Sequence, residues 1–94
     1  MNGQGPARAT VMIVNKRGLH ARASAKFVET AARFSCEVTV TKGDASVSGR
    51  SIMGLMMLAA SLGSSIELTA QGPDASEAVA ALIALIAAKF HEDA

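Results

Sequence analysis

A histidine and an arginine lie two residues apart in the segment Gly18-Leu19-His20-Ala21-Arg22. They come where an apolar strand is expected to give way to a helix. The free N–H groups and the positive dipole end of a helix amino terminus stabilise an anion and disfavour a protonated imidazole. A neutral His20 ring could therefore act as a nucleophile, and Arg22 could bind the oxygens of the phosphoryl group that arrives. The pair predicts a phosphohistidine site; the alternative is a histidine that only caps the helix.

The sequence around His20 is cationic. Residues 1–28 hold no acidic residue, and their basic residues are Arg8, Lys16, Arg17, Arg22 and Lys26. The net charge of the whole chain is only +1, so this local excess of positive charge would attract an anion. A nucleic-acid footprint would need a broader basic stripe, and three Phe without Trp or Tyr provide few surfaces on which bases could stack. We therefore expect no nucleic-acid partner.

Length and composition predict one domain. The 94 residues are enough for a single hydrophobic core; residues 1–8 are expected to form a flexible amino-terminal segment, and 9–94 the domain. Cys36 has no second cysteine with which to pair, and no run of residues is typical of a signal peptide. The longest uncharged apolar run, 78–88, is too short to cross a bilayer. These features predict a cytoplasmic protein without membrane insertion.

The sequence contains no motif of a self-sufficient enzyme. It has no Walker-type glycine loop, no HExxH pair and no nucleophile elbow. We therefore expect neither a hydrolase nor a kinase, and neither a cofactor nor a metal ion. Cys36 is expected to be a buried structural thiol, and His91, which Glu92 and Asp93 follow near the carboxyl end, a solvated tail residue without a chemical role.

The pattern of apolar residues predicts seven elements. They are strands over 9–14, 36–41, 45–48 and 66–70, and helices over 21–34, 51–62 and 74–90. Asp74 and Glu77 are expected to form a capping pair at the start of the last helix. The strands alternate apolar and polar residues, which is typical of an antiparallel sheet with one face in water. The prediction is an α+β fold, an open-faced β-sandwich of order βαββαβα with a four-stranded antiparallel sheet and three helices on one face.

Ser51 directly precedes the apolar run of the second predicted helix. Its hydroxyl is a suitable N-cap, because it can accept a hydrogen bond from a free N–H of the first turn. A phosphate on Ser51 would interact favourably with the helix dipole and add negative charge to the surface. Ser51 is thus a candidate site of regulatory phosphorylation; the alternative is a plain N-cap.

The helix after Ser51 is apolar nearly all round, so a small domain cannot bury all of it. If Ile52, Leu55 and Ala59 face the sheet, then Met53 and Met57 line another face of this helix. Met56 lies close by, and methionine suits adaptable contact surfaces. Met53, Met56 and Met57 are therefore candidates for a partner-docking patch; the alternative is ordinary core packing.

The segment around His20, followed further along by Ser51-Ile52-Met53-Gly54, resembles the HPr family, the small phosphocarriers of the bacterial phosphoenolpyruvate-dependent phosphotransferase system. The resemblance covers roughly residues 9–90. It implies the open-faced sandwich fold and makes His20 the phosphohistidine, modified at Nδ1 by enzyme I. It also implies that Arg22 lies beside the phosphate and that Ser51 is the serine an ATP-dependent HPr kinase modifies.

The resemblance also implies partners. The donor would be enzyme I, the acceptor an EIIA-type protein, and HPr kinase/phosphorylase a further partner; the chain itself would be a carrier and not an enzyme. The docking surface would combine Arg22, Lys26 and the patch of Ile52, Met53 and Met56.

The resemblance leaves the pathway open. The chain departs from most members of the family in having Ala23 where they have proline, which affects how rigidly the first helical turn is held. The end of the chain is similar to the NPr branch of nitrogen-related phosphorelays, so a regulatory, nitrogen-type role is preferred. A sugar-uptake HPr is the first alternative, and an interaction module that is not phosphorylated is the second.

Overall fold

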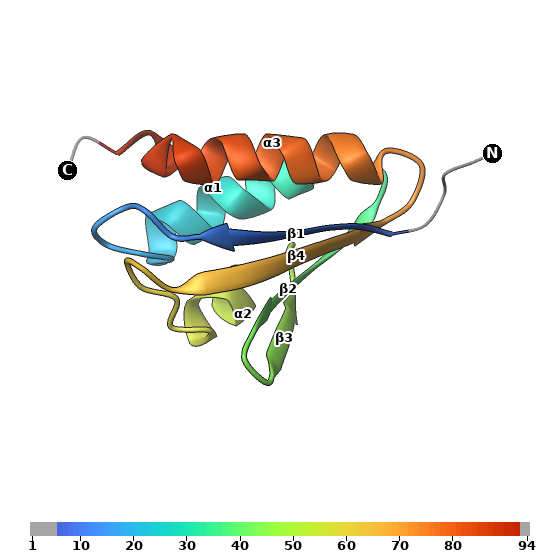
Figure 1. Cartoon of the computed structure of the whole chain (residues 1–94). Helices are drawn as coiled ribbons and strands as arrows, with labels where there is room; N and C mark the ends of the chain where they lie inside the picture. Colours follow the sequence, from blue (N-terminus) through green and yellow to red (C-terminus); the bar gives the residue numbers. More distant parts are fainter. Residues whose placement is uncertain (1–5, 93–94) are drawn as a thin grey trace.

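The computed structural model describes residues 6–92. The elements, in chain order, are β1 (Ala7–Met12), α1 (Ala21–Ala31), β2 (Glu37–Lys42), β3 (Ala45–Ser48), α2 (Ile52–Met57), β4 (Ser65–Gln71) and α3 (Ala75–Ala87), followed by a single 3-10 turn, η1 (Lys89–His91). The order confirms the predicted βαββαβα arrangement (Figure 1).

The four strands form one antiparallel sheet in the order β1-β4-β2-β3. The central pair keeps the apolar residues in register, since Val40 of β2 lies opposite Leu68 of β4. Alternate residues of β2 and β4 are buried, as the period of a strand requires. One face of the sheet therefore belongs to the core and carries the helices.

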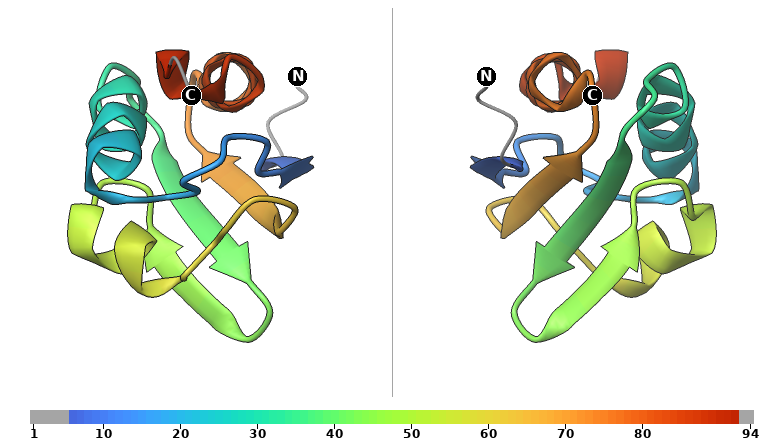
Figure 2. Two further views of the ribbon diagram at one scale, coloured as in Figure 1. Left: turned by 90° about the vertical axis from the view of Figure 1, so that its left-hand side faces the viewer. Right: turned by 90° about the vertical axis from the view of Figure 1, so that its right-hand side faces the viewer.

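The three helices lie on this one face of the sheet (Figure 2). Helix α3 packs on β1 and β4, α1 packs against α3, and α2 packs beside β3 and against α1. Phe27 of α1 and Phe90 of η1 are the largest fully buried side chains. The methionines of the described residues are exposed: Met12, Met53, Met56 and Met57.

Two boundaries near the start of the chain differ from the prediction. Strand β1 begins at Ala7, because Ala7 and Arg8 pair with Ala70 and Thr69 of β4. These two residues are therefore not part of the flexible segment expected over 1–8, of which residues 1–5 lie outside the described part of the chain. Helix α1 ends at Ala31 and not at 34, because residues 33 and 34 donate to carbonyls three positions back, in a tighter turn.

Helix α2 is much shorter than the predicted 51–62. It ends at Met57, and Ala59 adopts a left-handed conformation with φ 53°. The carbonyl of Ala60 accepts the Leu19 N–H at 2.9 Å, and the Gly63 N–H donates to the Ile13 carbonyl at 2.8 Å. These backbone groups are used by the neighbouring segment, so they cannot serve a continuing helix.

The last helix also differs from the prediction at both ends. The Asp74 side chain makes no capping bond to α3; it accepts the Ser35 N–H at 2.8 and 3.0 Å, so the predicted capping pair with Glu77 is wrong. The carboxylate satisfies a free N–H of the turn before β2 instead. At the other end, α3 stops at Ala87, and Phe90 enters the core from η1.

Candidate functional site

His20 is the N-cap of α1. Its backbone is extended, with φ −73° and ψ 179°, and its carbonyl accepts the Ser24 N–H at 2.8 Å. The ring takes the place of a capping hydroxyl, because Nδ1 accepts the Arg22 backbone N–H at 3.3 Å. The prediction that His20 lies at the amino end of a helix is confirmed.

A hydrogen-bonded loop holds the approach to His20. The buried Asn15 side chain donates from Nδ2 to the Gly18 carbonyl at 2.9 Å, and Gly18 adopts φ +63°. Leu19 is fixed to the Ala60 carbonyl through its N–H, and its own carbonyl accepts the Ser24 hydroxyl at 3.1 Å. The backbone directly before His20 is thus anchored to the segment after α2 and to α1.

The other ring nitrogen of His20 contacts the end of the chain. Nε2 forms a hydrogen bond with Glu92 Oε2, and Glu92 Oε1 accepts Asn15 Nδ2 at 3.1 Å. The exposed fractions of the two side chains are 21% for His20 and 9% for Glu92. His91 is exposed, as expected of a tail residue, but Glu92, which follows it, contacts the site; Asp93 lies outside the described residues. The charges of the first 28 residues suggested a purely cationic site, but the Glu92 carboxylate adds a negative charge to it.

These contacts determine which nitrogen of the ring carries the proton. Nδ1 accepts an N–H, so it holds a lone pair, and Nε2 then donates its hydrogen to the carboxylate. Burial alone would raise the pKa of the Glu92 carboxyl. The hydrogen bonds from His20 and Asn15, with the nearby charge of Arg17, outweigh burial and lower that pKa. Glu92 is therefore an anion at neutral pH.

The two predicted basic residues are placed differently. Arg22 is exposed, and no described residue forms a hydrogen bond or ion pair with its guanidinium. Lys26 is half-buried, and its Nζ donates to the Phe90 carbonyl at 2.6 Å. The Lys26 ammonium therefore holds η1 against α1, whereas the Arg22 guanidinium is available to an anion near His20.

Ser51 is the N-cap of α2, as predicted. Its hydroxyl accepts the Gly54 N–H at 2.9 Å. Leu55 is buried, but Ile52, which was expected to face the sheet with it, is 41% exposed. The exposed fractions of Met53 and Met57 are 71% and 80%. Because α2 is short and buries only one narrow side, its exposed apolar surface is larger than the sequence suggested.

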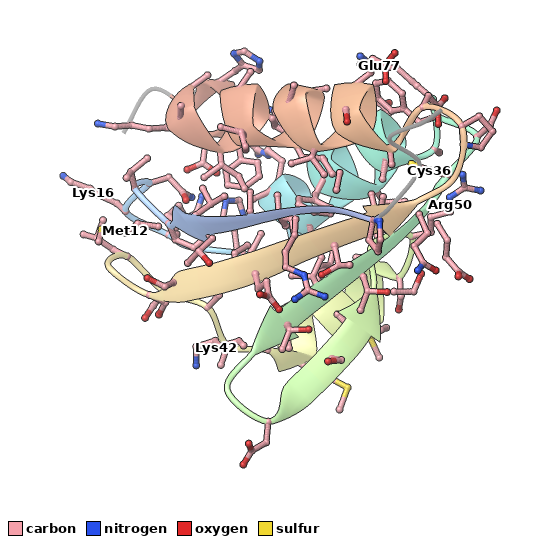
Figure 3. All side chains as sticks on the ribbon, turned by 45° about the vertical axis from the view of Figure 1, so that its right-hand side comes forward. Met12, Lys16, Cys36, Lys42, Arg50 and Glu77 are labelled. Atoms are coloured by element: carbon pink, nitrogen blue, oxygen red, sulfur yellow. The ribbon has the colours of Figure 1, made fainter. Side chains whose placement is uncertain are left out.

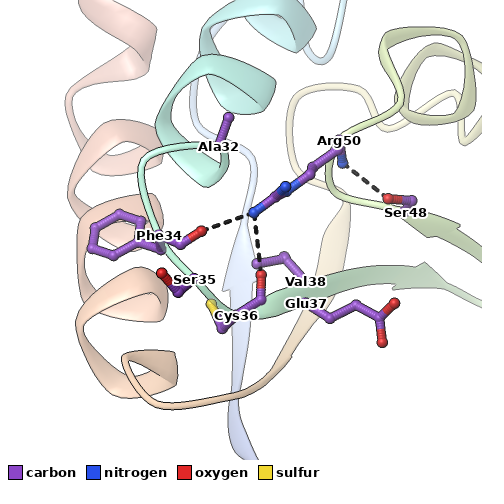
Figure 4. Close-up of a pocket in the computed structure, with 8 residues that line it drawn as sticks. All are labelled: Ala32, Phe34, Ser35, Cys36, Glu37, Val38, Ser48 and Arg50. Atoms are coloured by element: carbon purple, nitrogen blue, oxygen red, sulfur yellow. Dashed lines mark hydrogen bonds between the residues drawn. The ribbon is translucent and has the colours of Figure 1, made fainter.

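A surface cavity lies away from His20. It measures about 560 Å³, and at its edge Arg50 donates to the carbonyls of Phe34 and Cys36 (Figure 4). It lies at the carboxyl end of α1, whereas His20 is at the amino end. Cys36 is buried as predicted, and its burial, with the charge of Asp74, raises the pKa of the thiol. None of the predicted site residues lines this cavity.

Two further features of residues 6–92 bear on the class of site. No described helix has the length and apolar character needed to cross a membrane. In the same part of the chain, no three His, Cys, Asp or Glu side chains are grouped as ligands of a metal ion would be.

Comparison with known proteins assigns the chain to a family. Residues 7–88 match the family described as "PTS HPr component phosphorylation site". The phosphocarrier protein HPr of Neisseria meningitidis is 55% identical over 85 residues, which cover 90% of this chain and 96% of that protein. The chain belongs to the HPr family. It is accordingly a phosphocarrier of the phosphotransferase system and not a catalyst.

Other members support the assignment. The crystal structure of an HPr from Thermoanaerobacter tengcongensis superposes with a TM-score of 0.89 at 45% identity, over 94% of this chain and 99% of that chain. The phosphocarrier protein NPr of Shewanella violacea is 44% identical over 82 residues, 87% of this chain and 90% of that protein. Relatives thus carry both the HPr and the NPr name.

Sequence reasoning missed three residues around His20, namely Asn15, Phe90 and Glu92. Phe90 was placed in the last predicted helix, and neither Asn15 nor Glu92 was given a role at the site. The contact between His20 and Glu92 joins positions 72 apart in the chain, and no local pattern signals it. The only available signal was an acidic residue after a large apolar one near the end of the domain.

Proposed function

We propose that His20 is the phosphorylated residue of this carrier, that it accepts a phosphoryl group from enzyme I at Nδ1, and that it passes the group to an EIIA-type protein. The observation that carries the proposal is the lone pair of Nδ1 at the amino end of α1. A lone pair at this position is a nucleophile, and the end of the helix favours the negative charge that arrives.

The transfer needs no other group to move a proton. The Nδ1 lone pair attacks phosphorus as the P–N bond to the donor histidine breaks, and the electron pair of that bond stays on the donor nitrogen. The Arg22 N–H, which now donates to Nδ1, can then donate to a phosphoryl oxygen. The Arg22 guanidinium can reach the same phosphoryl group, because it is exposed and two residues away.

The exposed apolar residues of α2 are the proposed docking surface, together with Arg22 and Lys26. Ile52, Met53, Met56 and Met57 provide apolar area, and the hydrogen bond between Leu19 and Ala60 connects the His20 loop to the segment that follows α2. A partner seated on α2 would therefore have His20 within its reach. Of the two basic residues, Arg22 should contribute more, because the ammonium of Lys26 already binds the Phe90 carbonyl.

Ser51 is the proposed regulatory site, to be modified by an HPr kinase/phosphorylase. Its hydroxyl caps α2, so a phosphate there would keep an acceptor at the helix start while placing charge beside the apolar residues of the docking surface. Ser51→Asp should slow phosphorylation of His20 by enzyme I, because the charge disfavours burial of Ile52 and Met53 under the partner. An unchanged rate would separate Ser51 from the carrier function.

We assign the carrier to a regulatory, nitrogen-type system in the cytoplasm. Similarity to the Shewanella violacea NPr supports this branch, whereas similarity to the Neisseria meningitidis HPr favours the alternative, sugar uptake. The two are separated by offering the phosphorylated chain to nitrogen-type and sugar-type EIIA proteins. Faster transfer to the nitrogen-type acceptor supports our assignment, and faster transfer to the other supports sugar uptake.

The test of the carrier site is phosphorylation in vitro. The chain is incubated with enzyme I, Mg²⁺ and phosphoenolpyruvate, and its intact mass is measured before and after mild acid. We expect one phosphoryl group that acid removes and that His20→Ala does not acquire, with Ser51→Ala still phosphorylated. Acid-labile phosphate on His20→Ala would place the site elsewhere, and no phosphate on the wild type would favour an interaction module.

A further inference from the structure

We propose that Glu92 is a positioning residue for His20: its carboxylate keeps the proton on Nε2, directs Nδ1 toward the donor, and balances the positive charge of the phosphorylated ring. The inference rests on the proposed function, because it assumes that Nδ1 of His20 is the reacting atom. Glu92 touches the opposite side of the ring, so it does not compete with the phosphoryl group.

The first support is that both nitrogens of the ring are engaged and that the two contacts agree. The Arg22 N–H points at Nδ1 and the Glu92 carboxylate at Nε2, so each contact requires the same tautomer. A ring held at both nitrogens cannot rotate freely about its χ angles. His20 is therefore set in one orientation before the donor arrives, which is the arrangement that speeds a transfer between two bound groups.

The second support is a buried asparagine that holds the carboxylate. Asn15 is completely buried, and its Nδ2 donates to Glu92 Oε1 and to the Gly18 carbonyl. Within residues 6–92 its Oδ1 has no hydrogen-bond partner. A buried amide with an unpaired oxygen costs stability. The role of Asn15 is therefore to hold Glu92 and the His20 loop in place through its hydrogen bonds, and not to stabilise the core.

The third support is the backbone that delivers Glu92. Lys89, Phe90 and His91 have φ of 57°, 56° and 60°, three successive residues in the left-handed region with no glycine among them. This conformation is unfavourable for residues with a Cβ. Burial of the Phe90 side chain and the bond from Lys26 to its carbonyl hold the turn closed. The turn brings the chain back to the start of α1, at the end of the molecule where α3 finishes (Figure 1).

The carboxylate also has a role after the transfer. The Nδ1 lone pair has formed the bond to phosphorus, and the proton has stayed on Nε2, so the ring is a cation. Glu92 lies directly against Nε2 and is shielded from water, since 9% of its side chain is exposed. An anion at this place stabilises the cationic ring more than it stabilises the neutral ring. It therefore favours the phosphorylated carrier and the transition state that leads to it.

The test compares Glu92→Gln and Glu92→Ala with the wild type in steady-state phosphorylation by enzyme I and phosphoenolpyruvate. Gln keeps an oxygen that can accept the Nε2 hydrogen but has no charge, whereas Ala removes both. We expect kcat to fall about tenfold for Gln and up to about a hundredfold for Ala, with KM within about twofold of wild type. A change confined to KM would make Glu92 a docking residue, and unchanged kinetics would show that it does not position His20; either result overturns the proposal.

Two controls separate positioning from folding and from the identity of the site. Glu77→Gln removes an equal charge from the first turn of α3, at the opposite end of the molecule from Lys16 and the His20 loop, and should leave the kinetics unchanged (Figure 3).

In wild-type protein labelled with ¹⁵N-histidine, the Nε2 hydrogen of His20 should give a downfield, slowly exchanging signal that His20→Ala and Glu92→Ala lack. That signal needs no phosphorylation. If it is present but His20→Ala is still phosphorylated, the proposed function fails while the contact with Glu92 stands; if it is absent from the wild type, the positioning proposal fails.

Discussion

Replacing Gly18 with Ala should destabilise the loop before His20 by more than backbone conformation alone can explain. Gly18 has φ +63°, where a residue with a Cβ is disfavoured by about 1 kcal/mol. A Cβ at this position would lie 2.4 Å from the Ala60 carbonyl oxygen and 2.8 Å from Ser61 Cα. Both are backbone atoms, so the segment after α2 would have to move.

The size of the effect follows from what that movement breaks. The Ala60 carbonyl accepts the Leu19 N–H at 2.9 Å, and losing this bond while the groups stay buried costs about 1 to 3 kcal/mol. Together with the backbone strain, Gly18→Ala should lower the free energy of unfolding by about 3 kcal/mol. Gly43→Ala is the matched control, because Gly43 has φ +59° but no atom within 4 Å of its Cβ position; it should cost only about 1 kcal/mol.

The assay is urea-induced unfolding followed by far-UV circular dichroism, since the chain has no Trp or Tyr for fluorescence. The slope m should stay the same in all three proteins, so the midpoints can be compared directly. Equal losses of stability in the two variants would refute the reasoning, because the clash with Ala60 would then contribute nothing. A loss in Gly18→Ala of less than about 1 kcal/mol would refute the estimate of backbone strain as well.

Three further predictions each rest on one feature of the structure. Ala59→Gly should raise the free energy of unfolding by about 0.5 to 1 kcal/mol, because Ala59 is exposed at φ 53°; a lower urea midpoint would contradict this. The pKa of Glu92 is lowered in the folded protein, so its stabilisation should be complete above about pH 5 and decline as pH falls through the unfolded value and then the folded one. The stability difference from Glu92→Gln should therefore shrink in acid, and a difference independent of pH would refute the linkage. Burial and the charge of Asp74 raise the pKa of the Cys36 thiol, so iodoacetamide should alkylate the native protein at pH 8 at least about tenfold more slowly than the urea-unfolded chain, and equal rates would contradict its burial.

Local patterns in the sequence predicted the elements well. The alternation in 36–41 and 66–70 became β2 and β4 with one buried face, and the apolar period of 21–34 became α1. Ser51 is an N-cap, as its place before an apolar run suggested. These features depend on residues within a few positions of one another, so the interactions that stabilise them form within a short segment.

The ends of the elements were predicted less well, because distant partners decide them. Helix α2 stops early since the backbone of residues 60 and 63 pairs with the loop before His20. Asp74 does not cap α3 because a closer donor, the Ser35 N–H, comes from another part of the fold. Propensity favours a longer helix and a cap in these cases, but tertiary hydrogen bonds of similar strength compete with both.

The sequence alone determined the order of the elements and the place of His20 at the start of a helix. Only the tertiary structure decided what surrounds the imidazole. Glu92 reaches His20 across 72 positions because Phe90 is buried and its carbonyl is held by Lys26, 64 positions away. Such contacts depend on how α1 and α3 pack on the sheet, and no local preference of residues 89–92 favours the left-handed turn that completes the site.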